Sequence, residues 1–497
     1  MARLRTTFDL TLPERDAGIP AYQWLYSAIR AEILEGRLKP GAQLPSSRDL
    51  AEQYDLARGT VVIAFQQLES EGYIAGTVGS GTYVSKVLPD DLLHVPRDPR
   101  RQPAKTKPRR RVSDYAGRVT LFPPYAAHPG RAFRANVPAL DLFPTTLWAQ
   151  IAGRRLRRLS TTLLLGSGAM GYLPLREAVA EYLGTSRGVK CVPEQIAIVS
   201  GMQEALDLTA RIFLNRGDRV CMEDPGYIGA TIAFEGAGAK IIGLPVDREG
   251  VVLRRSSLRG SRLVYVTPAH QFPLGVTMSL SRRLELLEWA RQSGAMILED
   301  DYDSEYRYSG RPVPALQGLD QNDCVLFAGS FSKVLFPSLR LGYLVVPRDL
   351  VPTFDAVKSA TNRHASLLDQ AVLCDFIVEG HFGRHLRRMR QVYAERLSIL
   401  IETARQRLAG FLDVSPIEAG LQTVGWLPAG IDGKRVARAA AARKVHVTPL
   451  SEYSRGPMER DGLQLGFAAI DPHEIRRGIR ELAIALSANA KSPGRVV

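Results

Sequence analysis

The segment GSFSKVLFPSLRLGYLVVP (residues 329–347) places a group of polar side chains between two apolar runs. The group consists of two serines, a lysine and an arginine, at Ser330, Ser332, Lys333 and Arg340. Short apolar runs that end in glycine or polar residues are typical of strands buried on both faces of a sheet. The segment therefore predicts a loop with reactive and basic side chains beside a buried sheet.

The chain before this segment alternates short apolar runs with amphipathic stretches. The runs are QIAIVSG (195–201), RVCMED (219–224), RLVYVTP (262–268), AMILEDD (295–301) and CVLFAGS (324–330). Strands that alternate with helical patterns are typical of helices packed over a largely parallel sheet. We therefore predict an α/β fold for this part of the chain.

Length and composition indicate a folded protein with more than one domain. The 497 residues exceed what a single hydrophobic core usually supports. No signal-peptide core and no long charge-free apolar run is present, so we expect a cytoplasmic protein without membrane contact. We expect no metal site, because the cysteines lie far apart, at Cys191, Cys221, Cys324 and Cys374.

Positive charge is concentrated in one stretch of the chain. The formal net charge is +14, but residues 1–85 carry eight basic and ten acidic side chains, a net charge of −2. Residues 96–111 carry eight basic side chains and one acidic one, a net charge of +7, together with four prolines. Because such a stretch buries little apolar surface, we predict a basic, proline-rich linker over residues 86–125.

The N-terminal region has the pattern of a winged helix-turn-helix domain, which we place at residues 15–85. Ser46 is a suitable N-cap for a short helix, and a tight turn leads from that helix to a second one over residues 57–73. The segment YIAGTVGSGTYVS (73–85) follows with β-prone residues around a glycine-rich tip, as in a two-stranded wing.

This region resembles the GntR superfamily of DNA-binding regulators across nearly all of residues 20–85. The resemblance implies binding to a double-stranded DNA operator. Arginine can pair with guanine through two hydrogen bonds, and backbone amides and hydroxyl groups can hold phosphate. The residues expected to face DNA are Arg48, Arg58, Gly59, Thr60, Gly79, Ser80 and Gly81.

The segment quoted first resembles the Schiff-base lysine segment of fold-type I aminotransferases. The resemblance implies that Lys333 forms a Schiff base with pyridoxal 5'-phosphate. It also implies that Ser330, Ser332 and Arg340 bind this cofactor, with Ser330 and Arg340 on its phosphate. The implied fold is a large α/β domain with a smaller C-terminal α+β subdomain, over residues 126–490.

Three acidic residues follow one another at the end of the run AMILEDD. Alternation along a strand puts Asp300 on the face opposite its two neighbours. In the resemblance, Asp300 binds the pyridine nitrogen and keeps the ring protonated, and Tyr302 reaches the phenolic oxygen of the cofactor.

Further cofactor contacts are implied at two strand ends. A strand passes into a helix at VSGMQEAL (199–206), where the amides near Gly201, Met202 and Gln203 can hold phosphate. In EDPGY (223–227), the resemblance puts Tyr227 against the pyridine ring. In TPAHQFPLG (267–275), either His270 or Gln271 can approach the cofactor, and the sequence does not decide between them.

The combination of a GntR-type head, a basic linker and an aminotransferase-like body resembles the MocR family of bacterial regulators. It implies a homodimer that senses pyridoxal phosphate, an amine or an amino acid. Gly229 stands where a GABA-sensing member of the family has an arginine. Gln464 stands where many aminotransferases have the arginine that binds the carboxylate of the substrate. Because both arginines are missing, we expect no efficient transamination. The alternatives are an active aminotransferase with an accessory DNA-binding domain and a scaffold without cofactor.

Overall fold

The computed structural model divides the chain into two units, residues 1–110 and 111–497, each described here by itself. It describes residues 10–15, 18–77, 81–88, 111–121, 132–309 and 314–490. The positions 78–80 of the predicted wing tip, and 89–110 and 122–125 of the predicted linker, lie outside these ranges.

The first unit is a winged helix-turn-helix, as predicted. Three helices precede a two-stranded antiparallel hairpin: α1 (Ala21–Leu34), α2 (Ser47–Gln53), α3 (Arg58–Ser70), β1 (Ile74–Thr77) and β2 (Gly81–Val84). The Ser46 side chain accepts from the backbone N–H of Asp49, and the Asp49 side chain accepts from that of Ser46, so both ends of this capping box are satisfied. Leu25 and Ile29 of α1 pack with Leu68 of α3 in a small core.

The second unit is built on an eight-stranded mixed sheet with the order β3-β10-β9-β8-β7-β4-β5-β6. The strands are β3 (Ile196–Val199), β4 (Arg219–Asp224), β5 (Lys240–Asp247), β6 (Gly250–Val251), β7 (Ser261–Val266), β8 (Met296–Asp301), β9 (Val325–Ser330) and β10 (Gly342–Val345). The five central strands from β9 to β5 run parallel, and β10 is antiparallel to both of its neighbours. The predicted α/β class is confirmed.

Helices cover both faces of this sheet, because alternate strand residues are apolar on each side. Leu298 and Tyr265 pack on one face against α9 (Met202–Phe213), α10 (Ile228–Gly236) and α15 (Val351–Thr361). Ile297, one position from Leu298, packs on the other face with α12 (Leu280–Ser293). Helices α8 (Leu173–Arg187) and α16 (Leu367–Val378) contribute to the same second layer. Further helices of this unit are α6 (Thr145–Arg157), α7 (Thr161–Leu165), α11 (Arg255–Leu258), α13 (Leu316–Leu319) and α14 (Phe331–Val334).

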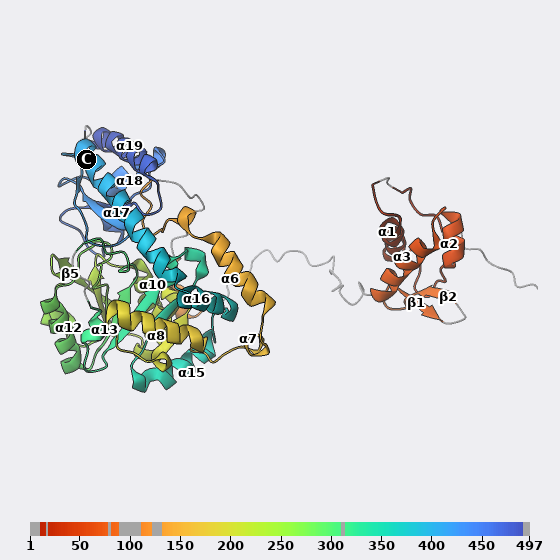
Figure 1. Ribbon diagram of the computed structural model, residues 1–497, viewed down its shortest axis with the longest axis horizontal. Helices are drawn as coiled ribbons and strands as arrows, with labels where there is room; N and C mark the ends of the chain where they lie inside the picture. Colours follow the sequence, from red (N-terminus) through yellow and green to blue (C-terminus); the bar gives the residue numbers. More distant parts are fainter. Residues whose placement is uncertain are drawn as a thin grey trace, which may run out of the picture. The chain divides into compact units, whose positions relative to one another are not determined.

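A smaller α+β subdomain ends the chain, as the resemblance implied. Its antiparallel sheet has the order β11-β12-β14-β13, with β11 (Asp413–Val414), β12 (Gln422–Trp426), β13 (Thr448–Pro449) and β14 (Gly462–Gly466). Helices α17 (His381–Arg407), α18 (Gly433–Ala442) and α19 (Pro472–Ala490) lie together at one end of the second unit in Figure 1.

The last part of the predicted linker belongs to the second unit. Residues 111–121 contain the short helix α5 (Asp114–Arg118), capped by Ser113. The Arg118 guanidinium donates to the Gly236 carbonyl oxygen at 3.0 and 3.2 Å. Tyr115 and Val119 pack against the same glycine, where a Cβ atom would lie 3.1 Å from Val119. We call residues 111–121 the docked segment. The structure thus orders these residues before the predicted domain start at 126.

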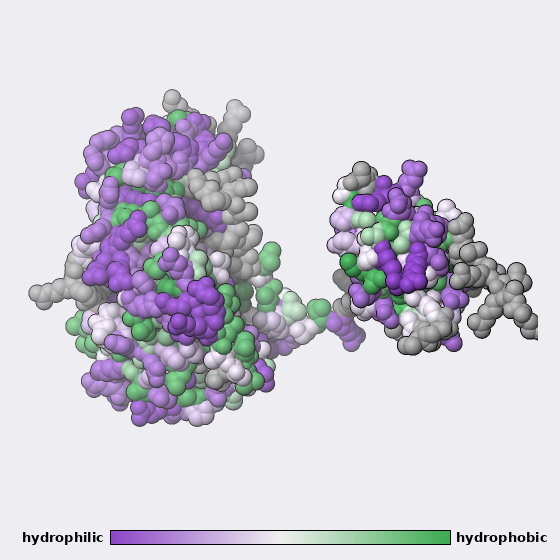
Figure 2. All heavy atoms as spheres, turned by 45° about the vertical axis from the view of Figure 1, so that its right-hand side comes forward, coloured by the Kyte–Doolittle hydropathy of each residue, from purple (hydrophilic) through white to green (hydrophobic). Residues whose placement is uncertain are grey.

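Hydrophilic residues cover most of the visible face of each unit, and apolar residues form small separate groups among them (Figure 2). None of the helices that the structure describes is both long and apolar enough to cross a bilayer. Within the described ranges, no group of three or more His, Cys, Asp or Glu side chains is arranged to hold a metal ion.

Candidate cofactor site and DNA-binding face

One cavity of about 1710 Å³ in the second unit brings together side chains from six separate segments. Seven residues predicted from the sequence line it: Met202, Gln203, Tyr227, Ser330, Ser332, Lys333 and Arg340. They meet there because β3, β4 and β9 each end at this edge of the sheet and lead directly into the helices or turns that carry them. Their role as cofactor ligands remains a prediction.

One end of the cavity has the properties of an anion site. Gly201, with φ +96°, is the N-cap of the 12-residue helix α9. The backbone N–H groups in the first turn of this helix have no partner within the helix and can donate to an anion. A Cβ atom on Gly201 would lie 3.3 Å from the Arg340 guanidinium, which shows how closely the arginine approaches this backbone. The Ser332 hydroxyl is buried and has no hydrogen-bond partner among the described residues.

Lys333 lies one turn beyond the end of β9. The Ser330 hydroxyl accepts from the Ser332 amide at 3.2 Å and so fixes the start of the short helix α14 that carries the lysine. The Lys333 ammonium donates to the Asn136 carbonyl oxygen at 3.0 Å. The amine is thus held inside the cavity by a neutral acceptor.

Asp300 is 4% exposed and lies on the opposite face of β8 from its two acidic neighbours. The Tyr265 hydroxyl donates to Asp300 Oδ2 at 2.6 Å, while Oδ1 has no partner in the described part of the chain. Burial raises the pKa of Asp300 from 3.8 to about 7, and the hydrogen bond from Tyr265 opposes this rise. By contrast, Glu299 accepts from the amides of Leu316 and Gln317, and Asp301 pairs with Arg187.

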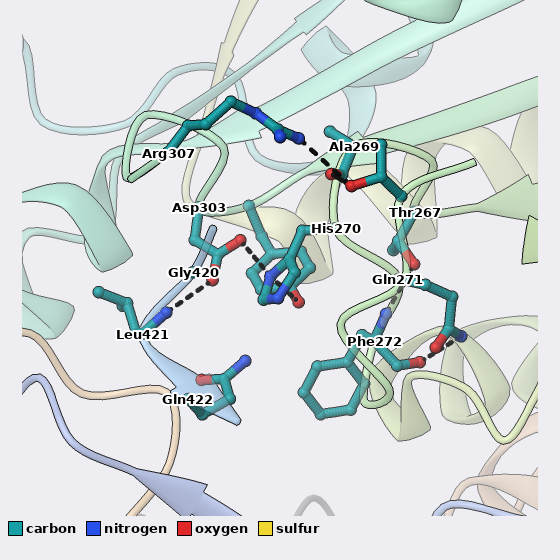
Figure 3. Close-up of polar contacts among 12 residues, drawn as sticks. Thr267, Ala269, His270, Gln271, Phe272, Asp303, Arg307, Gly420, Leu421 and Gln422 are labelled. Carbon is teal, nitrogen blue, oxygen red and sulfur yellow. Dashed lines mark hydrogen bonds and ion pairs between the residues drawn. The ribbon is translucent and has the colours of Figure 1, made fainter. Parts of the chain in front are cut away.

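Neither alternative, His270 or Gln271, is among the residues that line the cavity, and the same is true of Gly201, Asp300 and Tyr302. Gln271 bonds through its amide nitrogen to the carbonyl oxygen of Pro225 and to that of Phe272, so it stabilises its own turn. His270 Nδ1 lies 2.9 Å from Asp303 Oδ1 and 3.0 Å from the Tyr302 hydroxyl (Figure 3). His270 therefore contacts Tyr302, the residue expected to reach the cofactor, rather than the cavity itself.

Three residues that the sequence did not single out complete this region. Tyr265 bonds to Asp300, Asn136 bonds to Lys333, and Asp303 bonds to both His270 and the Leu421 amide. A tyrosine within the aliphatic run RLVYVTP was a usable signal for Tyr265. No local pattern marks Asn136, because it meets Lys333 from 197 positions away in the sequence.

The predicted DNA-facing residues of the first unit lie on its surface. Arg48, Arg58 and Gly59 are exposed and Thr60 is partly buried at the start of α3. Arg58 Nε lies 3.5 Å from the Ser47 hydroxyl, which connects the two helices of the motif. Gly81 is exposed at the start of β2, whereas Gly79 and Ser80 lie outside the described residues.

The family described as "Bacterial regulatory proteins, gntR family" matches residues 21–84, and "Aminotransferase class I and II" matches residues 135–482. The chain is 42% identical to the "Probable rhizopine catabolism regulatory protein MocR" of Rhizobium meliloti, over 96% of this chain and 95% of that protein. The chain belongs to the MocR family of GntR-type transcriptional regulators.

Other relatives of this MocR-family protein agree with both of its units. It is 30% identical to the pyridoxine biosynthesis transcriptional regulator PdxR of Corynebacterium glutamicum, over 96% of this chain and 97% of that protein. Among solved structures, it is similar to the α-aminoadipate aminotransferase LysN of Thermus thermophilus, complexed with N-(5'-phosphopyridoxyl)-L-leucine. The TM-score is 0.69 and the identity 29%, with 77% of this chain and 98% of that chain covered. The fold of the second unit is therefore that of proteins whose site holds a pyridoxyl group.

The two positions without the expected arginine are both closely packed. A Cβ atom on Gly229 would lie 2.6 Å from the Tyr227 ring, so glycine is needed for the present position of that tyrosine. Gln464 is 0% exposed and accepts from the Tyr453 hydroxyl at 3.0 Å. The arginines that line the cavity are Arg134, Arg211 and Arg340.

Proposed function

We propose that this transcriptional regulator binds pyridoxal phosphate and an amine ligand in its second unit, and that this binding changes its affinity for operator DNA. The observation that carries the proposal is that one cavity is lined by Lys333, by Arg340 and by Met202 at the start of α9. A lysine amine and a phosphate site within one cavity are the two attachments that this cofactor requires.

The residues present fit the cofactor by their unmet hydrogen-bonding capacity. Asp300 Oδ1 is a buried acceptor that lacks a partner in the described ranges, and a protonated ring nitrogen would supply one. The Ser332 hydroxyl is likewise buried without a partner among the described residues, and a phosphate oxygen would accept a hydrogen bond from it. When bound, the cofactor supplies an aldehyde that reacts with amines and a ring that accepts electrons.

In this proposal, the side chains around the cavity bind and orient the cofactor and its ligand, and few of them serve to catalyse rapid turnover. Lys333 offers its amine, while Arg340 and the amides at the start of α9 hold the phosphate. Tyr227 forms one wall and is braced by Phe272, with ring centroids 5.8 Å apart. His270, backed by Asp303, holds the Tyr302 hydroxyl in a fixed position.

A route from this cavity towards the first unit starts at the docked segment. Tyr115, Val119 and Leu121 of this segment line the same cavity as Lys333. Arg118 ties the segment to α10, and the chain then runs back through residues 86–110 to the DNA-binding unit. A ligand that contacts this wall would favour or disfavour the docking of residues 111–121, the part of the second unit that comes first in the sequence.

The proposal includes a homodimer in the cytoplasm, where a bacterial chromosome lies. Leu164 and Leu165 of α7 are 70% and 83% exposed, which is unusual for adjacent leucines and suits a surface that a second copy covers. Two DNA-binding units per dimer would protect two half-sites on the operator.

The second candidate is an active aminotransferase with an accessory DNA-binding domain. It is favoured by the similarity to LysN and by Arg134, which lines the cavity and could bind a carboxylate. Sustained conversion of an amino donor and a keto acceptor by the purified protein would support this candidate. Stoichiometric binding without turnover would support the regulator that we propose.

The proposal is tested with the full-length protein and DNA from the promoter upstream of its own gene. The measurement is the affinity for this DNA with and without pyridoxal phosphate, in the wild type, Lys333→Ala and Lys240→Ala. Lys240 is an exposed lysine at the start of β5 and serves as the matched control. We expect the cofactor to change the affinity of the wild type and the control but not of Lys333→Ala. Equal responses in all three proteins, or no response in any, would contradict the proposal.

A further inference from the structure

One side of helix α3 in the first unit faces away from the core of that unit. Val61, Ala64 and Leu68 of this helix are buried and pack with α1. Gly59 and Ile63 lie one helical turn apart on the opposite side, and both are exposed. Because the second helix of a helix-turn-helix motif lies in the major groove of DNA, this exposed side is the one that the base edges meet.

The fold of the first unit does not require a glycine at position 59. Gly59 is the second residue of α3 and is not among the glycines with a positive φ. A Cβ atom placed on it would have no side chain or neighbouring segment of the described chain within 4 Å. Glycine lowers the stability of a helix relative to alanine, so the fold gains nothing from it here. What the glycine provides is open space, which lets the backbone of α3 approach a bound partner closely.

Ile63 is 51% exposed, which makes it the most exposed large apolar side chain of α1, α2 and α3. A β-branched side chain also has a lower helix propensity than alanine, so neither the core nor the helix accounts for an isoleucine at this position. Side chains on a helix lean towards its N-terminus, and the side chain of Ile63 therefore covers the turn that contains Gly59. An apolar surface and an open space are thus adjacent on the exposed side of α3.

The chemistry of this surface selects one group among those that DNA presents. Arg58 is the one basic side chain of α3 and Glu69 the one acidic side chain, so charge gives this helix little attraction to phosphate beyond Arg58. Ile63 neither donates nor accepts a hydrogen bond, so it cannot distinguish the polar groups of the bases. The 5-methyl group of thymine is the apolar group that base edges present in the major groove.

We propose that Ile63 is a specificity-determining residue that recognises a thymine of the operator, with the 5-methyl group of that thymine packed against Ile63 in the space left open at Gly59. The inference concerns the first unit alone and goes beyond the proposed function, which names no base of the operator. It adds a base contact that depends on shape and apolar surface rather than on hydrogen bonds.

The test replaces the thymines of the operator one at a time with deoxyuridine, which lacks the 5-methyl group and keeps the same base pairing. The operator is the site that the full-length wild-type protein protects in the promoter upstream of its own gene. Affinity is measured by fluorescence anisotropy for the wild type, Ile63→Ala and Leu34→Ala; Leu34, an exposed leucine at the end of α1, is the matched control. We expect one thymine position at which deoxyuridine weakens binding by the wild type and the control about fourfold, the effect of burying one methyl-sized group. Ile63→Ala should bind both DNAs equally at that position.

Gly59→Ala tests the close approach separately. The added methyl group has open space in the free protein, so the thermal unfolding midpoint should not fall. On the operator the same methyl group would stand between α3 and the base edges, so operator affinity should fall about tenfold or more. Affinity for random-sequence DNA should change much less, because it depends on phosphate contacts.

All measurements are made without cofactor or amine, so this inference can fail while the proposed response to pyridoxal phosphate holds, and the reverse. The inference would be overturned if no thymine of the operator is sensitive to loss of its methyl group. It would equally be overturned if Ile63→Ala keeps the sensitivity of the wild type at every position, or if Gly59→Ala binds the operator as tightly as the wild type does. If Ile63→Ala binds too weakly to measure, Ile63→Val decides, and it should show a smaller methyl effect than the wild type.

Discussion

The substitution Asp300→Asn should stabilise the cofactor-free protein at high pH and weaken cofactor binding. Asparagine keeps an acceptor for the Tyr265 hydroxyl but cannot ionise. In the wild type, burial raises the pKa of Asp300 from 3.8 to about 7. Between these values the folded protein binds more protons at this site than the unfolded chain does, so its stability falls as the pH rises through this window.

The size of the effect follows from the pKa shift. A raised pKa costs nothing below the unfolded value of 3.8 and reaches its full cost above about 7. Between pH 5 and pH 8, the titration of Asp300 should remove about 2 to 3 kcal/mol from the free energy of unfolding of the wild type, and nothing from that of Asp300→Asn. Asp300 is 4% exposed, so solvent screens little of this cost.

The assay is urea unfolding of cofactor-free protein at several pH values, for the wild type and Asp300→Asn. Other buried carboxyl groups, such as Glu223 and Glu299, titrate in both proteins, so only the difference between the two proteins reports on Asp300. The difference should grow in favour of the variant from pH 5 to pH 8, while its retention of pyridoxal phosphate falls. A difference that stays constant with pH would refute the reasoning about Asp300.

Three further substitutions test other parts of the proposal. Lys333→Ala should abolish the absorbance of lysine-linked cofactor, and a borohydride-reducible linkage that persists in this variant would show that another lysine is used. Gly229→Ala should push the Tyr227 ring from its position, since the added Cβ would lie 2.6 Å from it, and should weaken cofactor retention measured by dialysis; unchanged retention would contradict the role of Tyr227. Arg58→Ala should cost about 1–3 kcal/mol of operator binding and relax discrimination at one base pair, as measured by competition with mutated operators. An equal loss for operator and random DNA would mean that Arg58 contacts only phosphate.

The fold was predictable because its signals are local. The alternation of apolar runs and amphipathic stretches indicated the α/β class, and the cap at Ser46 marked the second helix of the DNA-binding motif. The docked segment was not predicted, because its basic and proline-rich surroundings dominate the local composition. What orders it is a distant partner: the Arg118 guanidinium bonds to Gly236, 118 positions away.

The candidate site was predictable only where a motif carried it. Lys333 and Asp300 stand in recognisable segments, and alternation alone placed Asp300 on its own face of β8. The pairing of Tyr265 with Asp300 depends on two adjacent strands in a particular register, which no single segment encodes. Likewise, the sequence left His270 and Gln271 open, because the choice depends on Asp303 and on the carbonyl groups of a distant turn.

Two buried polar groups of the predicted cofactor site are left unpaired in the structure. They are the Ser332 hydroxyl, which lines the cavity, and Asp300 Oδ1, on the strand next to β9, and both lack partners among the described residues. Each lowers the stability of the ligand-free state, and a bound molecule that pairs with the group would remove this cost. A binding site of this kind has a large difference in free energy between its empty and occupied forms. In the regulator that we propose, this difference would be available to change the docking of residues 111–121, three of which line the same cavity. In an enzyme, the same unpaired groups would increase the reaction rate only if they formed better hydrogen bonds with the transition state than with the substrate.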